Sequence, residues 1–215
     1  MSLTLYFHPL SSFCQKVLIA LYENGTPFKP QIVDLRDEAQ RAALRKIWPI
    51  GKFPVLRDDV TDRTIAESSI IIEYLAQHYP GRTRLIPADA DAASQMRMQD
   101  RFFDLYVNAP MAKVVTDRLR PPGKNDPHGV EEAKMQLQTA LAMIEKDIAT
   151  KSWAMGDEFT MADCAAAPSL FYANMVMPFA DTHRHAAGYL GRLMERPSFA
   201  RALDEAKPYL ELMPK

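Results

Sequence analysis

The pattern of apolar residues changes character once along this chain, and that change limits the folds open to it. Over the first eighty of 215 residues, short alternating segments and amphipathic segments take turns, as strands and helices do. From about Asp91 onward the spacing of apolar residues is helical throughout. We therefore predict an α/β domain over residues 1–81, a linker over 82–90, and an all-helical bundle domain over 91–215.

The N-terminal part combines strands and helices in a recognisable order. The apolar spacing predicts a strand at 3–7, a helix at 12–24, a strand at 28–33, a helix at 38–47, strands at 53–56 and 63–65, and a helix at 67–79. Gly25 stands at the expected C-cap of the first helix. This order corresponds to a βαβ unit followed by a ββα unit.

Long helical patterns occupy the second half of the chain. They cover 91–119, 130–150, 161–177 and 183–195, with a short pattern at 198–206. Thr160 and Asp163 have the spacing of a capping box at the start of the third pattern. Pro110 and Pro168 lie inside helical patterns, so each predicts a kink or a local break.

Composition and charge argue against several classes of function. The formal net charge of -1 gives no overall attraction to nucleic acid or to a membrane surface. No apolar run reaches the roughly 18 residues expected of a membrane span, and the first residues lack the pattern of a signal peptide. Cys14, Cys164 and the five histidines show no metal or disulfide spacing. We expect a cytoplasmic protein without a metal and without nucleic-acid or membrane partners.

Two hydroxyl groups stand where the first predicted strand gives way to the first helix. Ser11 and Ser12 follow the turn His8-Pro9-Leu10 and lead directly into an amphipathic segment. Free backbone N–H groups and the positive end of a helix dipole can hold an anion there, including a thiolate. Taken alone, serines in this position most often serve as helix N-caps.

Two further motifs of the first domain fit such a site. Phe53-Pro54 opens the third predicted strand, where a cis bond would present the N–H and C=O groups of Phe53 to a ligand. Only about one X-Pro bond in twenty is cis, so the sequence leaves this open. Glu67 and Ser68 begin the third helix, where they could hold the ammonium and carboxylate groups of an amino-acid head.

The order and spacing of these motifs resemble the cytosolic glutathione S-transferase family. The segments are Ser-Ser-Phe-Cys-Gln-Lys-Val-Leu-Ile-Ala-Leu at 11–21, Trp-Pro-Ile-Gly-Lys-Phe-Pro-Val-Leu at 48–56, and Ile-Ala-Glu-Ser-Ser-Ile-Ile-Ile-Glu-Tyr-Leu at 65–75. The helical second half with its Thr160 cap is similar as well, so the resemblance spans the chain. It implies a thioredoxin-like domain that binds glutathione, a helical domain with an electrophile pocket, and a homodimer formed through the third and fourth helices.

The resemblance assigns roles to the residues expected around the thiol and the cysteinyl part of glutathione. Ser11 matches the catalytic serine of the serine-type classes, which stabilises the glutathione thiolate, and Ser12 is the next hydroxyl to consider. Phe53 with Pro54 matches the backbone clamp on the cysteinyl part of glutathione. The family more often has a small β-branched residue before this proline, so Phe53 adds bulk near the pocket.

The remaining roles concern the two ends of the tripeptide and the second substrate. Glu67 and Ser68 match the γ-glutamyl site, and Lys52 matches a position that in some classes pairs with the glycyl carboxylate. Tyr106, on the first long helix of the second domain, has a polar tip that could line the cleft between the domains.

Activation of the thiol would require only a modest stabilisation. A free thiol with a pKa near 8.5 is only a few per cent ionised at pH 7. Lowering that pKa by about two units needs roughly 2.7 kcal/mol. A hydroxyl hydrogen bond to a charged acceptor contributes about 1.5–3 kcal/mol, and a helix dipole adds about 0.3–1 kcal/mol. A serine at the start of a helix is therefore sufficient without a metal or a general base.

Three functions on this fold remain open. The first is transfer of glutathione to small apolar electrophiles. The second is a glutathione-dependent isomerase, because the Ser-Ser-x-x-x-Lys-Val pattern is similar to the class that isomerises maleylacetoacetate; Phe13 stands where that class has cysteine. The third is a non-catalytic binding protein of the stress-response type, which would be expected to have a degraded glutathione site. Thiol transfer is disfavoured because Ser11 cannot form a mixed disulfide.

Overall fold

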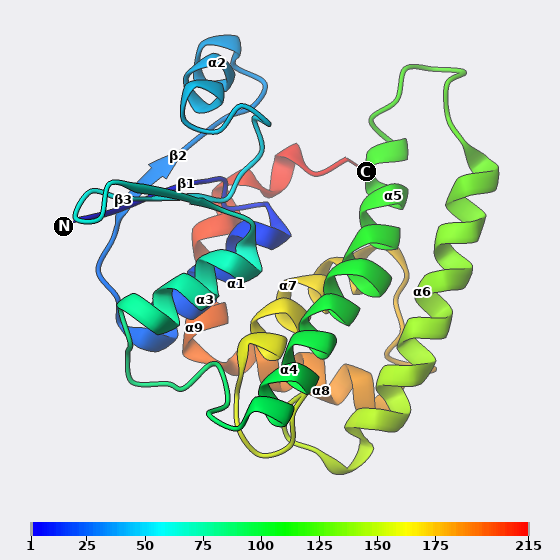
Figure 1. Ribbon diagram of the computed structural model, residues 1–215. Coiled ribbons are helices and arrows are strands. Elements are labelled where there is room, and N and C mark those ends of the chain that lie inside the picture. Colours follow the sequence, from blue (N-terminus) through cyan, green and yellow to red (C-terminus); the bar gives the residue numbers. More distant parts are fainter. Residues whose placement is uncertain (1, 215) are drawn as a thin grey trace.

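A four-stranded sheet with three helices forms the N-terminal part of the computed structural model, which describes residues 2–214 (Figure 1). The elements are β1 Leu3–Phe7, α1 Ser12–Asn24, β2 Lys29–Ile32, α2 Glu38–Ile47, β3 Val55–Asp58, β4 Arg63–Ala66 and α3 Ser68–His78. The strand order is β2-β1-β3-β4, with β1 parallel to β2 and the other two pairs antiparallel. The predicted thioredoxin-like α/β domain is confirmed.

The two faces of the sheet pack against different helices. Leu3, Leu5 and Phe7 of β1 belong to a core cluster that includes α1 and α3, whereas Val55 of β3 packs with Leu44 of α2 in a separate small cluster. In Figure 1, α1 and α3 accordingly lie on one side of the sheet and α2 on the other. Alternation of side chains across each strand produces these two layers.

The strand boundaries differ slightly from those expected. β3 begins at Val55 instead of Phe53, because Pro54 has no N–H to donate to a ladder. β2 covers Lys29–Ile32 and is exposed along its length, which suits an edge strand that contains Pro30. Gly25 has a φ of +63° and caps α1, as predicted.

The helical part surrounds one buried helix. Its elements are α4 Ala90–Phe102, a π-helical segment Phe103–Asn108, α5 Ala109–Asp117, α6 Pro127–Asp147, the 3-10 turn Ile148–Thr150, α7 Met161–Val176, α8 Arg184–Glu195, α9 Pro197–Ala206 and the 3-10 segment Lys207–Leu212. Every residue of α7 from Met161 to Leu170 is buried, and α7 contacts both α4 and α1. The predicted all-helical second domain is thus confirmed, and its central helix also packs against the first domain.

The two prolines inside helical patterns have different outcomes. The pattern expected at 91–119 is interrupted by the π-helical turn that immediately precedes Pro110. Pro110 has no N–H and its ring would clash with the carbonyl of Tyr106, so a wider turn relieves the conflict. By contrast, α7 continues without a break across Pro168.

The capping box at the start of α7 is present. The backbone N–H of Thr160 donates to Asp163 Oδ2 at 2.8 Å, and the Thr160 hydroxyl lies 3.2 Å from the same oxygen. The other carboxylate oxygen accepts from the N–H of Ala154 at 2.8 Å and from the hydroxyl of Tyr189 at 2.6 Å. The motif therefore also joins the preceding loop and α8 to the start of α7.

Candidate functional site

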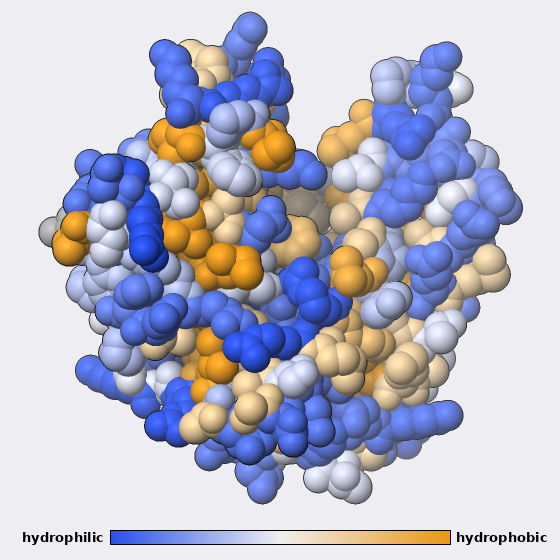
Figure 2. All heavy atoms as spheres, viewed as in Figure 1, coloured by the Kyte–Doolittle hydropathy of each residue, from blue (hydrophilic) through white to orange (hydrophobic). Residues whose placement is uncertain are grey.

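A cavity of about 320 Å³ lies between the α/β domain and the first helices of the second domain. In Figure 2 the molecule is hollowed between the lobe that carries α2 and the upper ends of α5 and α6. The α/β domain lines the cavity with Phe13, Trp48, Lys52, Phe53, Pro54, Ala66, Glu67 and Ser68. The helical domain adds Arg101, Asp104, Leu105 and Ala109. Five of the eight predicted site residues are thus brought together in one cavity.

The Phe53–Pro54 peptide bond, which the sequence left undecided, is cis. Pro54 is buried and Phe53 is half-buried at the cavity wall. The Phe53 ring stacks on His8 with ring centroids 6.2 Å apart, and His8 in turn meets the edge of Tyr209. Burial lowers the pKa of His8, so its ring is neutral at pH 7 and this side of the cleft gains no charge from it.

The start of α3 has an unusual backbone. Glu67 has a φ of +68°, in the left-handed region that residues with a Cβ rarely adopt. Its exposed side chain makes no capping hydrogen bond to α3, although the residue occupies the N-cap position. Ser68 beside it is only 5% exposed. Non-glycine residues with such backbone angles cluster at ligand sites, and here Glu67 lines the cavity.

The two serines are close to the cavity but do not line it. Ser11 is the N-cap of α1, and its Oγ accepts a hydrogen bond from the N–H of Cys14 at 3.3 Å. Ser12 is the first residue of α1, and both serines are half-buried. The next side chain, Phe13, is 37% exposed and faces the cavity. A role for either hydroxyl in holding a thiolate stays a prediction.

Cys14 is a packing residue. It is completely buried, and burial raises the pKa of its thiol to about 12 despite a hydrogen bond from Ser11. The thiol is therefore protonated at neutral pH and takes no part as a thiolate.

The two remaining predicted residues, Lys52 and Tyr106, differ in their position relative to the cavity. Lys52 is exposed at the cavity, where its ammonium group can reach a ligand carboxylate. Tyr106 is 57% exposed and packs against Phe102, with ring centroids 5.6 Å apart, and it is not among the residues that line the cavity. Its neighbour Leu105 faces the cavity instead. The π-helical turn sets these directions, and helical periodicity alone does not reveal it.

A buried cluster of charges that the sequence did not predict lies behind the start of α3. Lys16 of α1 is 1% exposed, and its Nζ lies 2.6 Å from Asp100 Oδ1, 2.8 Å from Asp104 Oδ2 and 2.9 Å from Ser69 Oγ. Ser69 also donates to Asp100 Oδ2 at 2.7 Å. We call Lys16, Ser69, Asp100 and Asp104 the Lys16 cluster. It connects α1 and α3 to the helical domain immediately beside Glu67 and Ser68.

Arg101 extends this cluster to the cavity. Its half-exposed guanidinium contacts Asp100, Asp104 and Ser69 and also lines the cavity near Glu67. Burial raises the pKa of Asp104, and the nearby Lys16 opposes that shift. A lysine within the apolar run of the first helix was the one visible signal, but its partners are 84 and 88 residues away. The cavity therefore presents a cation and a carboxylate close together, which suits a zwitterionic ligand.

Residues 2–214, the range that the structure describes, contain neither a cluster suited to a metal ion nor a helix suited to span a membrane. In that range no three His, Cys, Asp or Glu side chains gather in a way that could hold a metal ion. Likewise, none of the helices described there has the length and apolar character needed to cross a membrane.

Comparisons with known proteins agree with this fold. Residues 5–83 match the model of the glutathione S-transferase N-terminal domain, and residues 127–205 match that of the C-terminal domain. Glutathione S-transferase 3 of Zea mays is 31% identical over 208 residues, which cover 94% of this chain and 93% of that protein. The chain therefore belongs to the glutathione S-transferase family.

More distant relatives widen the range of functions. Glutathione S-transferase GstB of Escherichia coli K12 is 28% identical, covering 79% of this chain and 82% of that protein. A stringent starvation protein A homolog of Pasteurella multocida is 27% identical, with 96% and 92% covered. A glutathione S-transferase structure from Methylobacterium radiotolerans, in complex with glutathione sulfonate, is 26% identical with a TM-score of 0.82, covering 93% of each chain. Proteins named as glutathione S-transferases and a protein named as a stringent starvation protein A homolog are thus both similar to this chain.

Proposed function

We propose that this protein is a glutathione transferase that joins the glutathione thiolate to small apolar electrophiles. The observation that carries the proposal is the single cavity that collects Lys52, the cis Phe53–Pro54 pair, and Glu67 with Ser68. These groups match the three parts of a tripeptide with a free ammonium group and two carboxylates. The glutathione derivative bound to the related Methylobacterium radiotolerans protein supports the same ligand class.

Each end of the tripeptide has a plausible partner. The ammonium group of the γ-glutamyl part fits the carboxylate of Glu67, and its carboxylate fits Ser68 with the N-terminus of α3. Arg101, which the sequence did not single out, adds a cation on the opposite wall. Lys52 would take the glycyl carboxylate. The central cysteinyl part would then lie along the backbone of Phe53, with its sulfur toward the start of α1.

Ser11 is the proposed catalytic residue, because its hydroxyl stands at the start of α1. In the bond-forming step the thiolate sulfur, which accepts a hydrogen bond from the Ser11 O–H, attacks the electrophilic carbon. A C–S bond forms, and the leaving group, a halide ion in the case of an aryl halide, departs with the electron pair of the broken bond. The proton of the bound thiol has left before this step, since the hydroxyl and the helix N-terminus favour the charged form. The Ser11 oxygen accepts from the N–H of Cys14, and this bond does not use the hydroxyl proton that would be donated to the sulfur.

The electrophile would bind on the helical side of the cavity. Leu105 and Ala109 line that side, with Phe13 and Trp48 opposite. Apolar substrates gain from burial against such side chains. Tyr106 was the expected contact, and its packing against Phe102 favours Leu105 in that role. A detoxification role, a cytoplasmic location and a homodimer belong to this proposal.

Turnover with an aryl halide, measured from pH 6 to 8, tests the proposal. We expect Ser11→Ala to lower turnover at least tenfold at pH 7 and to move the activity profile to higher pH, because the bound thiol loses a hydrogen bond to its charged form. Ser12→Ala is the matched control and should stay within threefold of the parent. A Ser11→Ala variant within twofold of the parent at every pH would assign the role elsewhere.

A second function is favoured by the relative from Pasteurella multocida, a stringent starvation protein A homolog. On that alternative the chain binds partners and has no transferase activity. Retention on immobilised glutathione without turnover of any of a broad panel of electrophiles would favour it. The isomerase alternative is separated by an assay of cis–trans isomerisation with a maleyl keto acid.

A further inference from the structure

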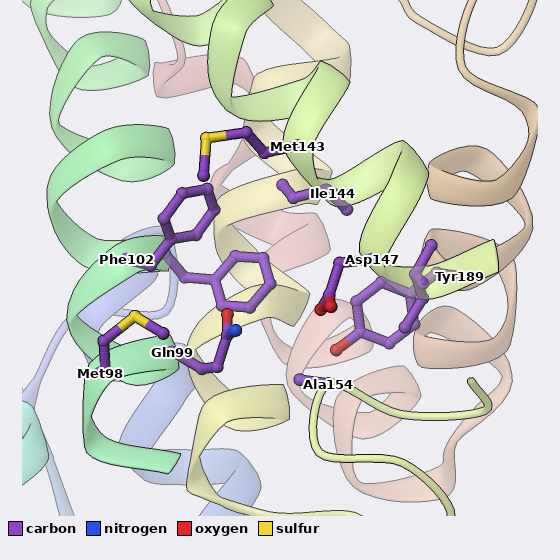
Figure 3. A pocket seen from close by; sticks show the side chains of 10 residues that line it. Met98, Gln99, Phe102, Met143, Ile144, Asp147, Ala154 and Tyr189 are labelled. Atoms are coloured by element: carbon purple, nitrogen blue, oxygen red, sulfur yellow. The ribbon is translucent and has the colours of Figure 1, made fainter. Parts of the chain in front are cut away.

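A second cavity lies within the helical domain, apart from the cleft. It has a volume of about 180 Å³ and is enclosed by α4, α6, the turn that follows α6, and α8 (Figure 3). Its floor consists of buried apolar and aromatic side chains: Phe103, Ile144, Ile148, Ala154 and Tyr189. No residue that lines this cavity also lines the cleft cavity, so the two sites are separate.

The aromatic walls of this cavity are held in place by their neighbours. Tyr189 is fully buried and its hydroxyl donates to Asp163 at 2.6 Å, so the ring rather than the hydroxyl is offered to a ligand. Phe102 meets Phe103 edge to face, with ring centroids 5.7 Å apart. An apolar molecule entering the cavity would therefore meet preformed ring surfaces.

The entrance is flanked by flexible side chains. Met98 of α4 is 56% exposed and Met143 of α6 is 55% exposed. In Figure 3, Met143 lies above the ring of Phe102 and Met98 lies below it. Exposed thioethers of this kind adapt to different ligand shapes, and exposed apolar side chains that gather at a cavity are typical of binding sites.

Two polar side chains point into this apolar space. Figure 3 shows the carboxylate of Asp147 and the amide of Gln99 turned towards the space between Phe102, Ile144 and Tyr189. Asp147 accepts a hydrogen bond from Lys151 at 2.6 Å, and the side chains of this pair are 46% and 32% exposed. Such exposed pairs at i, i+4 contribute little, so the carboxylate remains available to a ligand.

Size and charge together define the class of ligand. A cavity of about 150 Å³ lined by apolar side chains is sufficient for benzene, so this one accepts a single aromatic ring. Among the described residues that line it, Asp147 alone carries a charge, and that charge repels carboxylates and attracts ammonium groups. We propose that this cavity binds a small aromatic amine, with the ring against Phe102 and Tyr189 and the ammonium group on Asp147.

Ligand-observed NMR with the protein in its native oligomeric state tests the proposal. The probes are benzylamine, toluene and benzoate, titrated in the presence of saturating S-hexylglutathione so that the cleft is occupied. We expect benzylamine to bind at least fivefold more tightly than benzoate. Asp147→Asn should weaken benzylamine at least fivefold and leave toluene within twofold of the parent.

Two variants keep the test independent of folding and of transferase activity. Glu131→Gln is the matched control, because Glu131 is also on α6 and pairs with a lysine one turn away, Lys134. Met143→Trp should block all probes by filling the entrance. Absence of probe binding, an equal response of Asp147→Asn and Glu131→Gln, or binding that appears only when the protein is diluted to monomers would overturn the proposal. Turnover with glutathione should be unchanged within twofold in Asp147→Asn.

Discussion

The Lys16 cluster and the Asp163 capping site both bury carboxylates, yet they stabilise them in different ways. Asp100 and Asp104 are matched by the cations of Lys16 and Arg101, which come from two domains. Asp163 accepts hydrogen bonds from Ala154, Thr160 and Tyr189, and the contacts described for it include no cation. Burial raises the pKa of both Asp104 and Asp163, and it is opposed by nearby cations at Asp104 and by hydrogen-bond donors at Asp163.

The two sites have different roles in the fold, one within a domain and one between domains. Hydrogen-bond donors near a helix start can satisfy a carboxylate locally, so the Asp163 site closes one end of α7. A charge pair needs partners of opposite sign, and here those partners join α1 and α3 to the helical domain beside the cleft. The first arrangement holds one domain together, whereas the second joins the two domains beside the cleft cavity.

The largest effect is expected from Lys16→Met. Removing this cation leaves two buried carboxylates without their main partner, which costs about 3–5 kcal/mol of unfolding free energy. We also expect the KM for glutathione to rise at least fivefold, since Ser69 loses a partner next to Glu67 and Ser68. Urea unfolding and steady-state kinetics measure the two effects.

A double variant provides the control for this prediction. Lys16→Met combined with Asp104→Asn removes one charge of each sign, and it should regain part of the lost stability. A loss below about 1 kcal/mol in Lys16→Met alone would contradict the view that this buried lysine is essential to charge balance.

A somewhat smaller loss is expected from Asp163→Ala. This change leaves the buried donors of Ala154, Thr160 and Tyr189 without an acceptor, which costs about 2–4 kcal/mol. Steady-state kinetics distinguishes this site from the Lys16 cluster. The KM for glutathione should stay within twofold of the parent at temperatures where the Asp163→Ala variant is folded. A fivefold rise in KM would mean that the capping site also positions the cleft.

The smallest effect is expected from Arg97→Ala. Arg97 of α4 pairs with Glu73 of α3 through two hydrogen bonds of 2.5 Å and 2.9 Å, so it joins two of the helices that the Lys16 cluster also joins. Both side chains are partly exposed, at 47% and 31%, and such pairs contribute about 0.2–1 kcal/mol. Thermal unfolding of this variant and of Lys16→Met compares an exposed and a buried contact between the same domains. A much smaller loss of stability in Arg97→Ala would show that burial determines the size of the loss.

The same contrast explains how much could be predicted from the sequence. The capping box was predictable because Thr160 and Asp163 are three residues apart and form one local motif. The fold class was predictable because the change from alternating to helical periodicity reports the two domains directly. The Lys16 cluster was not, because its hydrogen bonds span 53 and 88 residues and depend on how the domains pack.

The candidate site shows the same division. Phe53, Pro54, Glu67 and Ser68 lie in motifs whose order indicated a family, and the cavity brings them together. The isomer of the Phe53–Pro54 bond, the left-handed backbone of Glu67 and the position of Arg101 all depend on tertiary structure. Tyr106 was chosen for its polar tip, and the π-helical turn in which it lies could not be predicted from the sequence.

The π-helical turn at Phe103–Asn108 has a consequence for how this cleft can vary among related chains. In an α-helix each residue advances about 100° around the axis, so one residue gained or lost there turns everything beyond it by that angle. A single deletion between 103 and 108 would therefore rotate the side chains of α5 around the axis while leaving the residues that the α/β domain contributes to the cavity in place. The length of this short turn thus determines which face of α5 lines the cavity.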